Sequence, residues 1–417
     1  MNPTNERSSK LGTVASYILI ATAVLAPLSF WPSPYFALEA VKTIVLAVGT
    51  LTSAALFLIL ALREKSLRLP PRSLVWVGGL LALATAVSAA QSGHFMKSFF
   101  GQGFEAGTGS FLILMLVAGW VAFTASSRKV DRIMVMYTAI GGSFIVLYLL
   151  HAFRFMFGAG FASFGILTSL TTTFLGTWYS VGIFSGMVAI IALASILLLP
   201  LPARFKNLYW VLVAAAAFGM LIIGAKEVWE AATVVFLGLA IYLWKSNRKA
   251  AIAPLVAAVL SLILIFQGNA IATPVINKIN AGYSELSLPW QMTLDVAAGE
   301  LKAQPLFGTG PNRFSQAFLT YKPSGINQSD LWGVEFNAGF GLIPTFVVTE
   351  GIIGSILWAL FFVFFCVLGF RSLRSMSRQD PDATVGEATT VMESEQPYAR
   401  FAIVSSFAAA SFLWIMA

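Results

Sequence analysis

Residues 179–199 read YSVGIFSGMVAIIALASILLL, a run of twenty-one residues without a charged side chain. An α-helix of about 20 apolar residues is just long enough to cross the ~30 Å hydrocarbon core of a bilayer. Ten other apolar runs of comparable length predict further membrane-spanning helices. The sequence therefore predicts an all-α, polytopic integral membrane protein with about eleven spans, at residues 11–31, 36–62, 73–90, 108–126, 133–155, 179–199, 207–225, 230–245, 250–267, 339–370 and 400–417.

The overall composition points the same way and excludes several classes of protein. Of 417 residues, 58% are hydrophobic and only 11% are charged, whereas about 25% of the residues in a soluble globular protein are charged. The chain has one Cys and two His. Because a disulfide framework or a conventional zinc site needs more of these residues, both are excluded, and we expect neither a metal nor another cofactor.

The net charge of +8 is explained by the orientation of the chain in a membrane. If the N-terminus is cytoplasmic, 18 of the 26 Lys and Arg residues fall on segments that face the cytoplasm. Every connection then satisfies the rule that cytoplasmic loops are rich in Lys and Arg. The cytoplasmic side carries +10 and the external side −2. We therefore expect a multi-pass protein of the cytoplasmic membrane, with membrane lipids and not nucleic acid as its surroundings.

Residues 1–417 form a single predicted transmembrane domain with two long connections. The external segment 268–338 is long enough to fold into helices that cap the membrane domain, and loops of this length are usually functional. The polar cytoplasmic segment 371–399 predicts a flexible linker. Run 339–370 is too long for one straight crossing, so we expect it to begin as a tilted or interfacial segment. Because the chain stops at Ala417, at the end of a span, we expect it to be part of a longer protein.

Charged residues within or beside the spans are the candidates for chemistry, because such residues are costly in a membrane. Lys226, Glu227 and Glu230 form a tight predicted hairpin, IIGAKEVWEA, with almost no polar loop around them. A functional role for these residues is therefore as well supported as the alternative, in which they only form a charged hairpin tip. Arg154 ends the fifth predicted span, where interfacial anchoring is the alternative to a binding role. Lys97 lies in a loop rich in glycine and aromatic residues that predicts a re-entrant or interfacial turn.

The long external segment contains the most specific pattern in the chain. Gly308 and Gly310 flank Thr309, and Pro311 follows. This order predicts a tight turn whose backbone N–H groups could bind an anion. The alternative is a simple joint between two helices, which these residues taken alone favour.

Several motifs in and after this segment resemble the bacterial O-antigen ligase family. They are the P-x-x-G-x-G-P-x-x-F stretch at residues 305–314, a preceding amphipathic PW…D helix, and the run TEGIIG at residues 349–354. The variant it most resembles has a YKP…LW…F pattern in the long loop, matched here by Tyr321, Lys322, Pro323, Leu331, Trp332 and Phe336. The order of spans is similar along most of the chain.

The resemblance implies a membrane glycosyltransferase of the GT-C type. Such an enzyme takes a glycan from undecaprenyl pyrophosphate at the external leaflet and transfers it to a glycan, lipid or protein acceptor. The family needs no metal; it uses external arginines to hold the pyrophosphate and a loop histidine to assist the acceptor hydroxyl. Positive donors suit a pyrophosphate leaving group because its charge develops in the transition state.

Carried over by position, the family pattern departs from this chain at three places. The phosphate-binding Arg falls on Lys226, the Arg after Trp290 is Gln291, and the catalytic His falls near Phe340, whereas Glu350 and Gly351 keep the end of the pattern. The resemblance then implies that Lys226 is the catalytic cation that binds the phosphate. Glu227, Glu230 and Glu335 are candidate catalytic bases because they are expected near the same cavity. The candidates for substrate binding are the remaining external cations, the glycine turn and the residue at the position of the missing Arg: Arg313, Lys322, Lys97, Arg154, Gly308, Gly310 and Gln291.

Three other functions stay open at this point. An O-antigen polymerase, which joins lipid-linked repeat units, shares the same motifs. A transporter is expected to show inverted repeats with paired broken helices, and no internal repeat is evident. A lipid-glycan binding protein without catalysis is compatible with the missing Arg and His.

Overall fold

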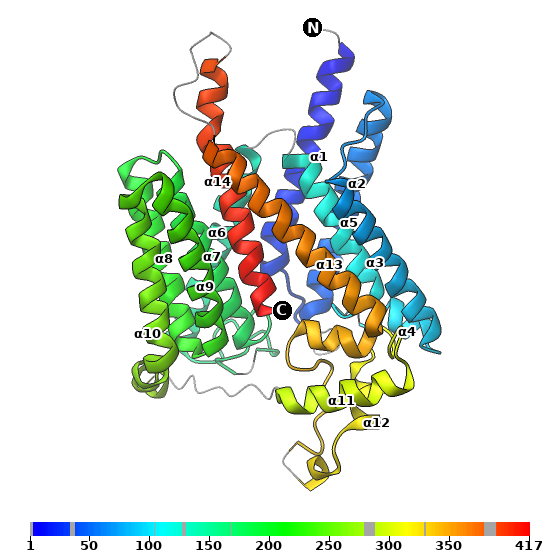
Figure 1. Ribbon diagram of the computed structural model, residues 1–417. Coiled ribbons are helices and arrows are strands. Elements are labelled where there is room, and N and C mark those ends of the chain that lie inside the picture. Colours follow the sequence, from blue (N-terminus) through cyan, green and yellow to red (C-terminus); the bar gives the residue numbers. More distant parts are fainter. Residues whose placement is uncertain are drawn as a thin grey trace.

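The computed structural model describes residues 3–33, 38–103, 105–126, 131–167, 169–278, 288–328, 331–378 and 389–417. None of these residues belongs to a β-strand, and Thr173 and Gly176 form an isolated β-bridge. The helices are α1 (Pro3–Leu28), α2 (Leu38–Glu64), α3 (Arg72–Gln91), α4 (Phe95–Phe99), α5 (Gly109–Ser126), α6 (Asp131–Phe157), α7 (Trp178–Leu198), α8 (Ala203–Ile223), α9 (Lys226–Ser246), α10 (Arg248–Lys278), α11 (Trp290–Ala303), α12 (Phe314–Tyr321), the 3₁₀-helix η1 (Ser324–Gln328), α13 (Leu342–Arg378) and α14 (Thr389–Met416) (Figure 1).

Eleven helices in the described part of the chain are long and apolar enough to cross a membrane, which confirms the predicted number of spans. Most observed bounds lie within a few residues of the predicted ones. The largest differences are in α14, which begins at Thr389, and in α10, which continues to Lys278 and so includes the first residues of the predicted loop 268–338. The predicted linker 371–399 is helical at both ends, to Arg378 and from Thr389, and its middle part, 379–388, lies outside the described residues.

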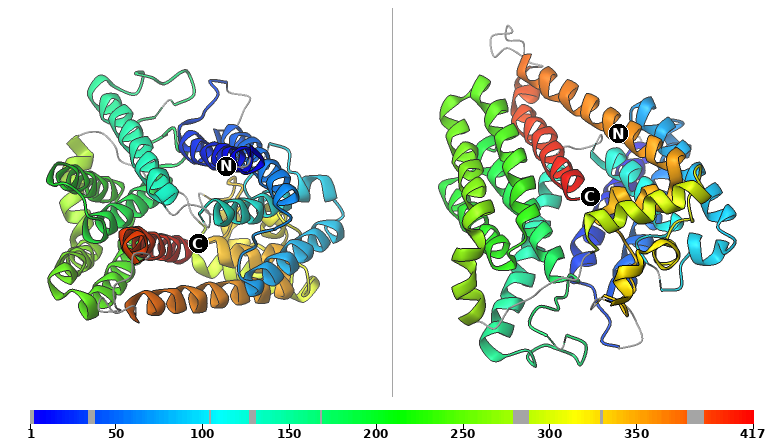
Figure 2. Two further views of the ribbon diagram at one scale, coloured as in Figure 1. Left: turned by 90° about the horizontal axis from the view of Figure 1, so that it is seen from above. Right: turned by 60° about the horizontal axis from the view of Figure 1, so that its bottom comes forward.

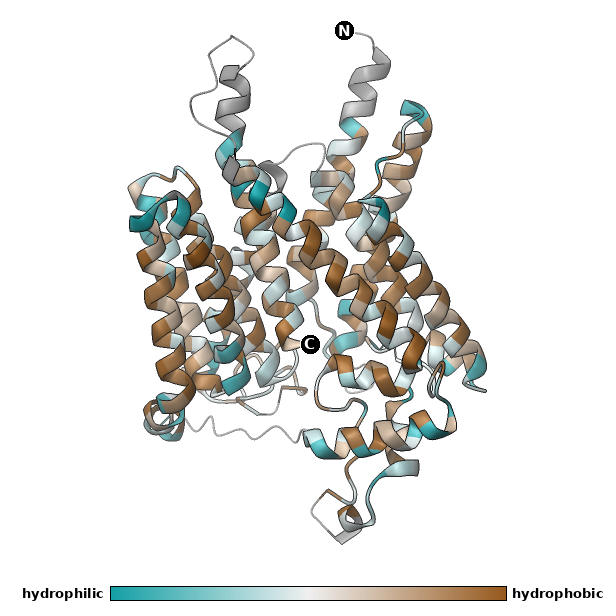
Figure 3. Cartoon of the chain, viewed as in Figure 1, coloured by the Kyte–Doolittle hydropathy of each residue, from teal (hydrophilic) through white to brown (hydrophobic). Residues whose placement is uncertain are grey.

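The long helices run roughly side by side and form a bundle with two distinct ends (Figures 1 and 2). One end contains the start of α1 and the C-terminal ends of α2, α5, α7, α9 and α13; we call it the basic end, because the predicted cytoplasmic cations lie next to these helix ends in the sequence. The opposite end, which we call the loop end, contains α4, α11, α12 and η1. Apolar residues fill the band between the two ends (Figure 3).

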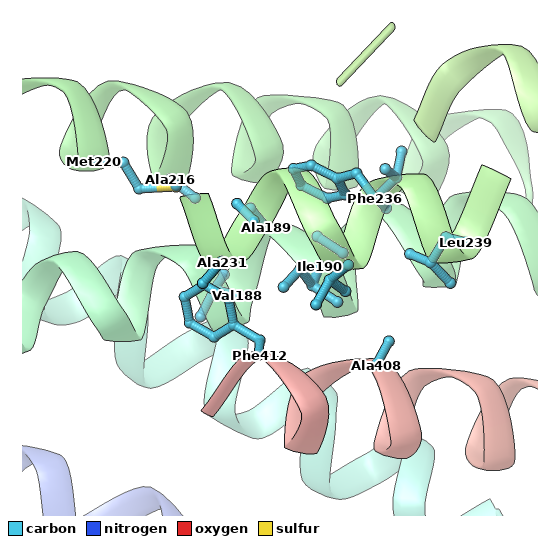
Figure 4. Close-up of a cluster of buried hydrophobic side chains, with 14 of the residues drawn as sticks. Val188, Ala189, Ile190, Ala216, Met220, Ala231, Phe236, Leu239, Ala408 and Phe412 are labelled. Atoms are coloured by element: carbon cyan, nitrogen blue, oxygen red, sulfur yellow. The ribbon is translucent and has the colours of Figure 1, made fainter. Parts of the chain in front are cut away.

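Helix α7, which contains the uncharged run of the opening motif, forms the centre of the largest core. Two thirds of its most apolar window is buried, a larger share than in any other span of the described chain. Its small residues allow neighbouring helices to approach closely: a Cβ added at Gly186 would lie 2.4 Å from the Phe412 ring of α14. Helices α8, α9 and α14 pack around α7 in this core (Figure 4).

Helix α13 crosses in front of the bundle and connects two groups of helices (Figures 1 and 2). Near the loop end it packs on α3, and further along it meets α14 through aromatic rings. Phe362 lies 5.0 Å from Trp414, and Phe365 lies 5.1 Å from Phe407, measured between ring centroids. The groups that α13 connects are α1–α5 on one side and α6–α10 with α14 on the other.

Candidate functional site

Helix α13 is interrupted at Gly351, whose φ of 66° and ψ of −162° are not helical. This agrees with the prediction that run 339–370 does not cross the membrane as one straight helix. A break leaves carbonyls before it and N–H groups after it without helical partners. Segment 305–310 provides partners through four backbone hydrogen bonds: Thr309 N to Val348 O (3.1 Å), Gly310 N to Thr349 O (2.9 Å), Ile352 N to Pro305 O (2.9 Å) and Ile353 N to Leu306 O (3.1 Å).

We call this arrangement of segment 305–310 and the interrupted helix the α13 joint. Two glycines make it possible, because both adopt a positive φ and both lie directly against backbone. A Cβ added at Gly308 (φ 61°) would lie 2.3 Å from Val348 O, and one added at Gly351 would lie 2.6 Å from Leu306 O. Two of the motifs that carry the family resemblance, 305–314 and 349–354, therefore meet at this joint.

Helix α3 holds the joint from the side through hydroxyl groups. Ser88 Oγ lies within hydrogen-bonding distance of Phe307 O (2.6 Å) and Thr349 O (3.0 Å). The buried Glu350 carboxylate accepts hydrogen bonds from Thr85 Oγ1 (3.0 Å) and from Trp358 Nε1 (3.2 Å). A buried carboxyl group is tolerated only when it is hydrogen-bonded, so Glu350 links α3 to both parts of α13.

The turn that follows the joint is attached to α3 and α4. Arg313 is 5% exposed, and its Nη1 donates to Ser92 O (2.7 Å) just beyond the end of α3. Ser98 Oγ donates to Pro311 O (2.8 Å). A cation bound to a carbonyl at the C-terminal end of a helix is favourable in that field. Arg313 therefore holds the loop on the membrane domain, and its burial lowers the pKa of its guanidinium from the ordinary value.

The N–H groups of the predicted anion-binding turn are all used inside the protein. Gly308 N donates to Gln304 O (3.2 Å), and the N–H groups of Thr309 and Gly310 form the joint described above. The tight turn is present, but its donors point toward carbonyls and not toward an anion. These contacts correspond to the structural alternative, a joint between two helices.

Arg154 also lies inside the protein and not at its surface. Its side chain is fully buried, and the guanidinium donates to four backbone carbonyls of loop 158–177: Thr172 O (2.6 Å), Leu167 O (2.7 Å), Ser169 O (2.8 Å) and Ala159 O (3.4 Å). A substrate phosphate has no access to a side chain in this position, so the structure does not support the predicted binding role for Arg154.

The hairpin residues lie at the start of α9, in the group of helices α6–α10. Lys226 Nζ forms an ion pair with Glu230 Oε1 at 3.2 Å, one helical turn apart, and both side chains are exposed. Glu227 is also exposed. Exposed pairs of this kind contribute little to stability. The start of α9 lies at the same end of the bundle as α11 and α12 (Figure 1), but these two helices pack on α13.

The other predicted residues are spread over the loop end. Lys322 is half-buried with its Nζ 5.8 Å from the centre of the Phe318 ring, and exposed Gln291 lies 3.4 Å from Asp295 Oδ1. Exposed Lys97 lines a cavity of about 380 Å³. The structure thus brings Gly308, Gly310, Arg313 and the α4 backbone at Lys97 together. Neither this cavity nor the second one, near the basic end, is lined by Lys226, Arg313 or Lys322.

Glu300 is a buried ionisable group that the sequence reasoning missed. It is 2% exposed, and its Oε1 has no hydrogen-bond partner among the described residues. Burial raises the pKa of this carboxyl group to about 7. A sequence signal was present, because Glu300 follows Thr293, Val296 and Ala297 at helical spacing on the buried face of α11.

We predict that Glu300→Gln stabilises the loop end at high pH. The raised pKa means that the folded group is protonated below pH 7, whereas in the unfolded chain it ionises near its ordinary pKa of 4.5. Stability therefore falls as pH rises from about 4.5 to 7 and stays low above that range. The gain from the substitution is small at pH 4.5 and reaches on the order of 3 kcal/mol at pH 8. Hydrogen exchange of α11 measures it. A gain of equal size at both pH values would contradict a titrating Glu300.

Comparison with known proteins leaves the fold and the site as described above. The chain matches no known protein-family profile, and no curated protein matches it.

Proposed function

We propose that the chain is a membrane glycosyltransferase of the O-antigen ligase type. In this proposal it transfers a glycan from an undecaprenyl-pyrophosphate carrier to a glycan or lipid acceptor at the external face of a bacterial cytoplasmic membrane. The observation that carries the proposal is the α13 joint. Segments 305–314 and 349–354, which carry the resemblance, are distant in sequence and form one hydrogen-bonded unit.

The arrangement of the two ends supports the proposed orientation. Among the described residues, the predicted cytoplasmic cations lie next to helix ends at the basic end, and the helices α11, α12 and η1 lie at the opposite end (Figure 1). Because cytoplasmic segments are enriched in Lys and Arg, we place the basic end in the cytoplasm. A carrier that presents its glycan at the external surface would then meet the loop end.

The state of the broken helix favours a transferase over a transporter. In many transporters the free ends of two discontinuous helices bind the substrate or the coupling ion. In the described chain α13 is the one helix with non-helical backbone angles inside it, and segment 305–310 already occupies its free N–H and C=O groups. The break therefore serves to attach the loop end, and leaves no open helix ends for a transported ion.

The proposed reaction assigns roles to the exposed side chains at the start of α9. The acceptor hydroxyl attacks the anomeric carbon of the glycan, and the bond from that carbon to the pyrophosphate oxygen breaks. The hydroxyl proton passes to the carboxylate of Glu227 or Glu230. Lys226 stabilises the negative charge that develops on the departing undecaprenyl pyrophosphate. Because Lys226 is paired with Glu230, binding of the pyrophosphate replaces this ion pair.

We predict that Lys226→Ala abolishes glycan attachment in cells and causes the lipid-linked precursor to accumulate. Loss of one stabilising charge lowers such a rate by about 10²–10³-fold, and Lys226→Arg should retain activity. Precursor and surface glycan are measured by gel and mass spectrometry at matched protein levels. The control is Lys278→Ala, which removes an exposed cation at the end of the neighbouring helix α10.

Three outcomes separate the alternatives. Normal attachment with normal protein levels in Lys226→Ala would remove the assigned role of Lys226. Loss of long chains with intact attachment of single repeat units would identify a polymerase. A purified wild-type protein that binds the carrier but transfers no glycan to any acceptor would identify a binding protein.

A further inference from the structure

The segment around α4 combines an apolar surface with polar side chains around one cavity. We call residues 92–103 the α4 segment; it connects the spans α3 and α5 at the loop end. Met96 and Phe100 are 67% and 50% exposed, and Phe95 is also exposed. Two flanking spans place this segment at the surface of the membrane, where exposed aromatic and apolar side chains insert among lipid headgroups and acyl chains.

The cavity of about 380 Å³ in this segment is lined by both polar and apolar groups: His94, Phe95, Met96, Lys97, Gly101 and Gln102. Lys97 is exposed, and no carboxylate of a described residue lies within ion-pair distance of its ammonium group. A lysine at the edge of a membrane keeps its ammonium group at the level of the headgroups while its stem contacts apolar atoms. The cavity therefore presents a positive charge beside an apolar surface.

Buried contacts with neighbouring residues maintain the shape of the α4 segment. Ser98 is fully buried, and its Oγ donates to Pro311 O (2.8 Å) next to the α13 joint. The carboxylate of Glu105 accepts hydrogen bonds from Gln102 N (3.0 Å) and Gly103 N (3.1 Å). Gly101 has a φ of 75°, a backbone conformation that favours glycine, and the Glu105 carboxylate lies where a Cβ would be.

The same contacts define which groups a ligand would meet. Because the Glu105 carboxylate accepts from the backbone N–H groups of Gln102 and Gly103, these two groups are not free to bind an anion in the cavity, and side chains are the other donors. Lys97 provides an ammonium group, Gln102 an amide, and His94 an imidazole. The most abundant anion at this depth of a membrane is the phosphate of a lipid headgroup, and Lys binds phosphate as a point charge.

We propose that the α4 segment binds the phosphate headgroup of an anionic membrane lipid, with Lys97 on the phosphate and Met96 and Phe100 on the acyl chains. The site is separate from the start of α9, and the inference does not rest on the proposed transferase activity. In this proposal the bound lipid holds the α4 segment, and with it the loop end, against the membrane surface. The hydrogen bond from Ser98 to Pro311 O connects the segment to the turn next to the α13 joint.

The test is lipid retention by the full chain in native mass spectrometry. We expect the protein to retain phosphatidylglycerol in preference to a diacylglycerol with the same acyl chains, which lacks the phosphate. Lys97→Ala should weaken retention of phosphatidylglycerol about fivefold. His94→Ala should weaken it as well. Met96→Ser should weaken binding of both lipids. The matched control, Lys278→Ala, removes one exposed cation at the same end and should change nothing.

Three results would overturn the inference. Retention in Lys97→Ala equal to that of the wild type would exclude Lys97 as the ligand. An equal loss in Lys278→Ala would show general attraction to anionic lipid. Displacement of the lipid by millimolar inorganic phosphate would identify a site for free phosphate. Matching unfolding temperatures for all variants exclude a change in folding, and His94→Ala provides the second reading if Lys97→Ala is unstable.

Discussion

Replacement of Arg154 by Ala is expected to destabilise the protein by on the order of 3–5 kcal/mol. The guanidinium is fully buried and binds four backbone carbonyls of loop 158–177. Without it these carbonyls lose their partner and have to find water or rearrange, which is costly for buried groups. We also expect the loop to become sensitive to protease, because the side chain that organises it is missing.

Thermal unfolding and limited proteolysis measure this effect. Arg154→Lys should recover part of the stability, since an ammonium group keeps the charge but has fewer donors in a different geometry. Arg204→Ala is the matched control; Arg204 is exposed near the basic end, where its guanidinium lies 5.0 Å from the Phe205 ring. That variant should change stability by less than about 0.5 kcal/mol. An Arg154→Ala protein as stable as this control would contradict the structural role.

Replacement of Gly308 by Ala is expected to open the α13 joint and to destabilise the protein by on the order of 2–4 kcal/mol. The added Cβ would lie 2.3 Å from Val348 O, and the residue has a positive φ that disfavours a side chain. The atoms that this Cβ would meet belong to the backbone of residues 348–351. No flexible side chain is therefore present that could move away to relieve the clash. Gly351→Ala should behave similarly, because its Cβ would meet Leu306 from the other side of the same joint.

Hydrogen exchange measures this effect. The amides of α11 and of the first turns of α13 should lose protection together. Gly325→Ala is the control, because a Cβ at Gly325 meets nothing within 4 Å. If Gly308→Ala changes α11 but leaves 342–350 protected, the two segments are not coupled through the joint.

The spans were predictable because membrane crossing depends on a local property. A helix in a bilayer satisfies its own backbone hydrogen bonds and needs only about 20 consecutive apolar residues. Residues 179–199 contain this information without reference to the rest of the chain, and α7 occupies 178–198. The break in α13 was partly predictable for the same reason, since run 339–370 was too long for one straight crossing.

The α13 joint itself was only half predictable. The glycines at 308 and 310 indicated a tight turn, and the structure contains one. The N–H groups of Thr309 and Gly310 in this turn donate to Val348 O and Thr349 O, about forty residues further along the chain, and no local pattern specifies partners at that distance. The resemblance to a known family pointed to both segments without indicating that they touch.

The candidate site residues show most clearly where local information ends. Arg154, Arg313 and Lys226 are all cations near the ends of predicted helices. The first is buried among the carbonyls of a loop, the second is bound to Ser92 O, and the third is exposed and paired with Glu230. Apolarity and length are properties of consecutive residues, so the sequence alone determines the all-α membrane fold and the order of its spans. The environment of each charged side chain depends on which carbonyls and carboxylates from distant parts of the chain surround it. These neighbours are determined only when the helices pack together.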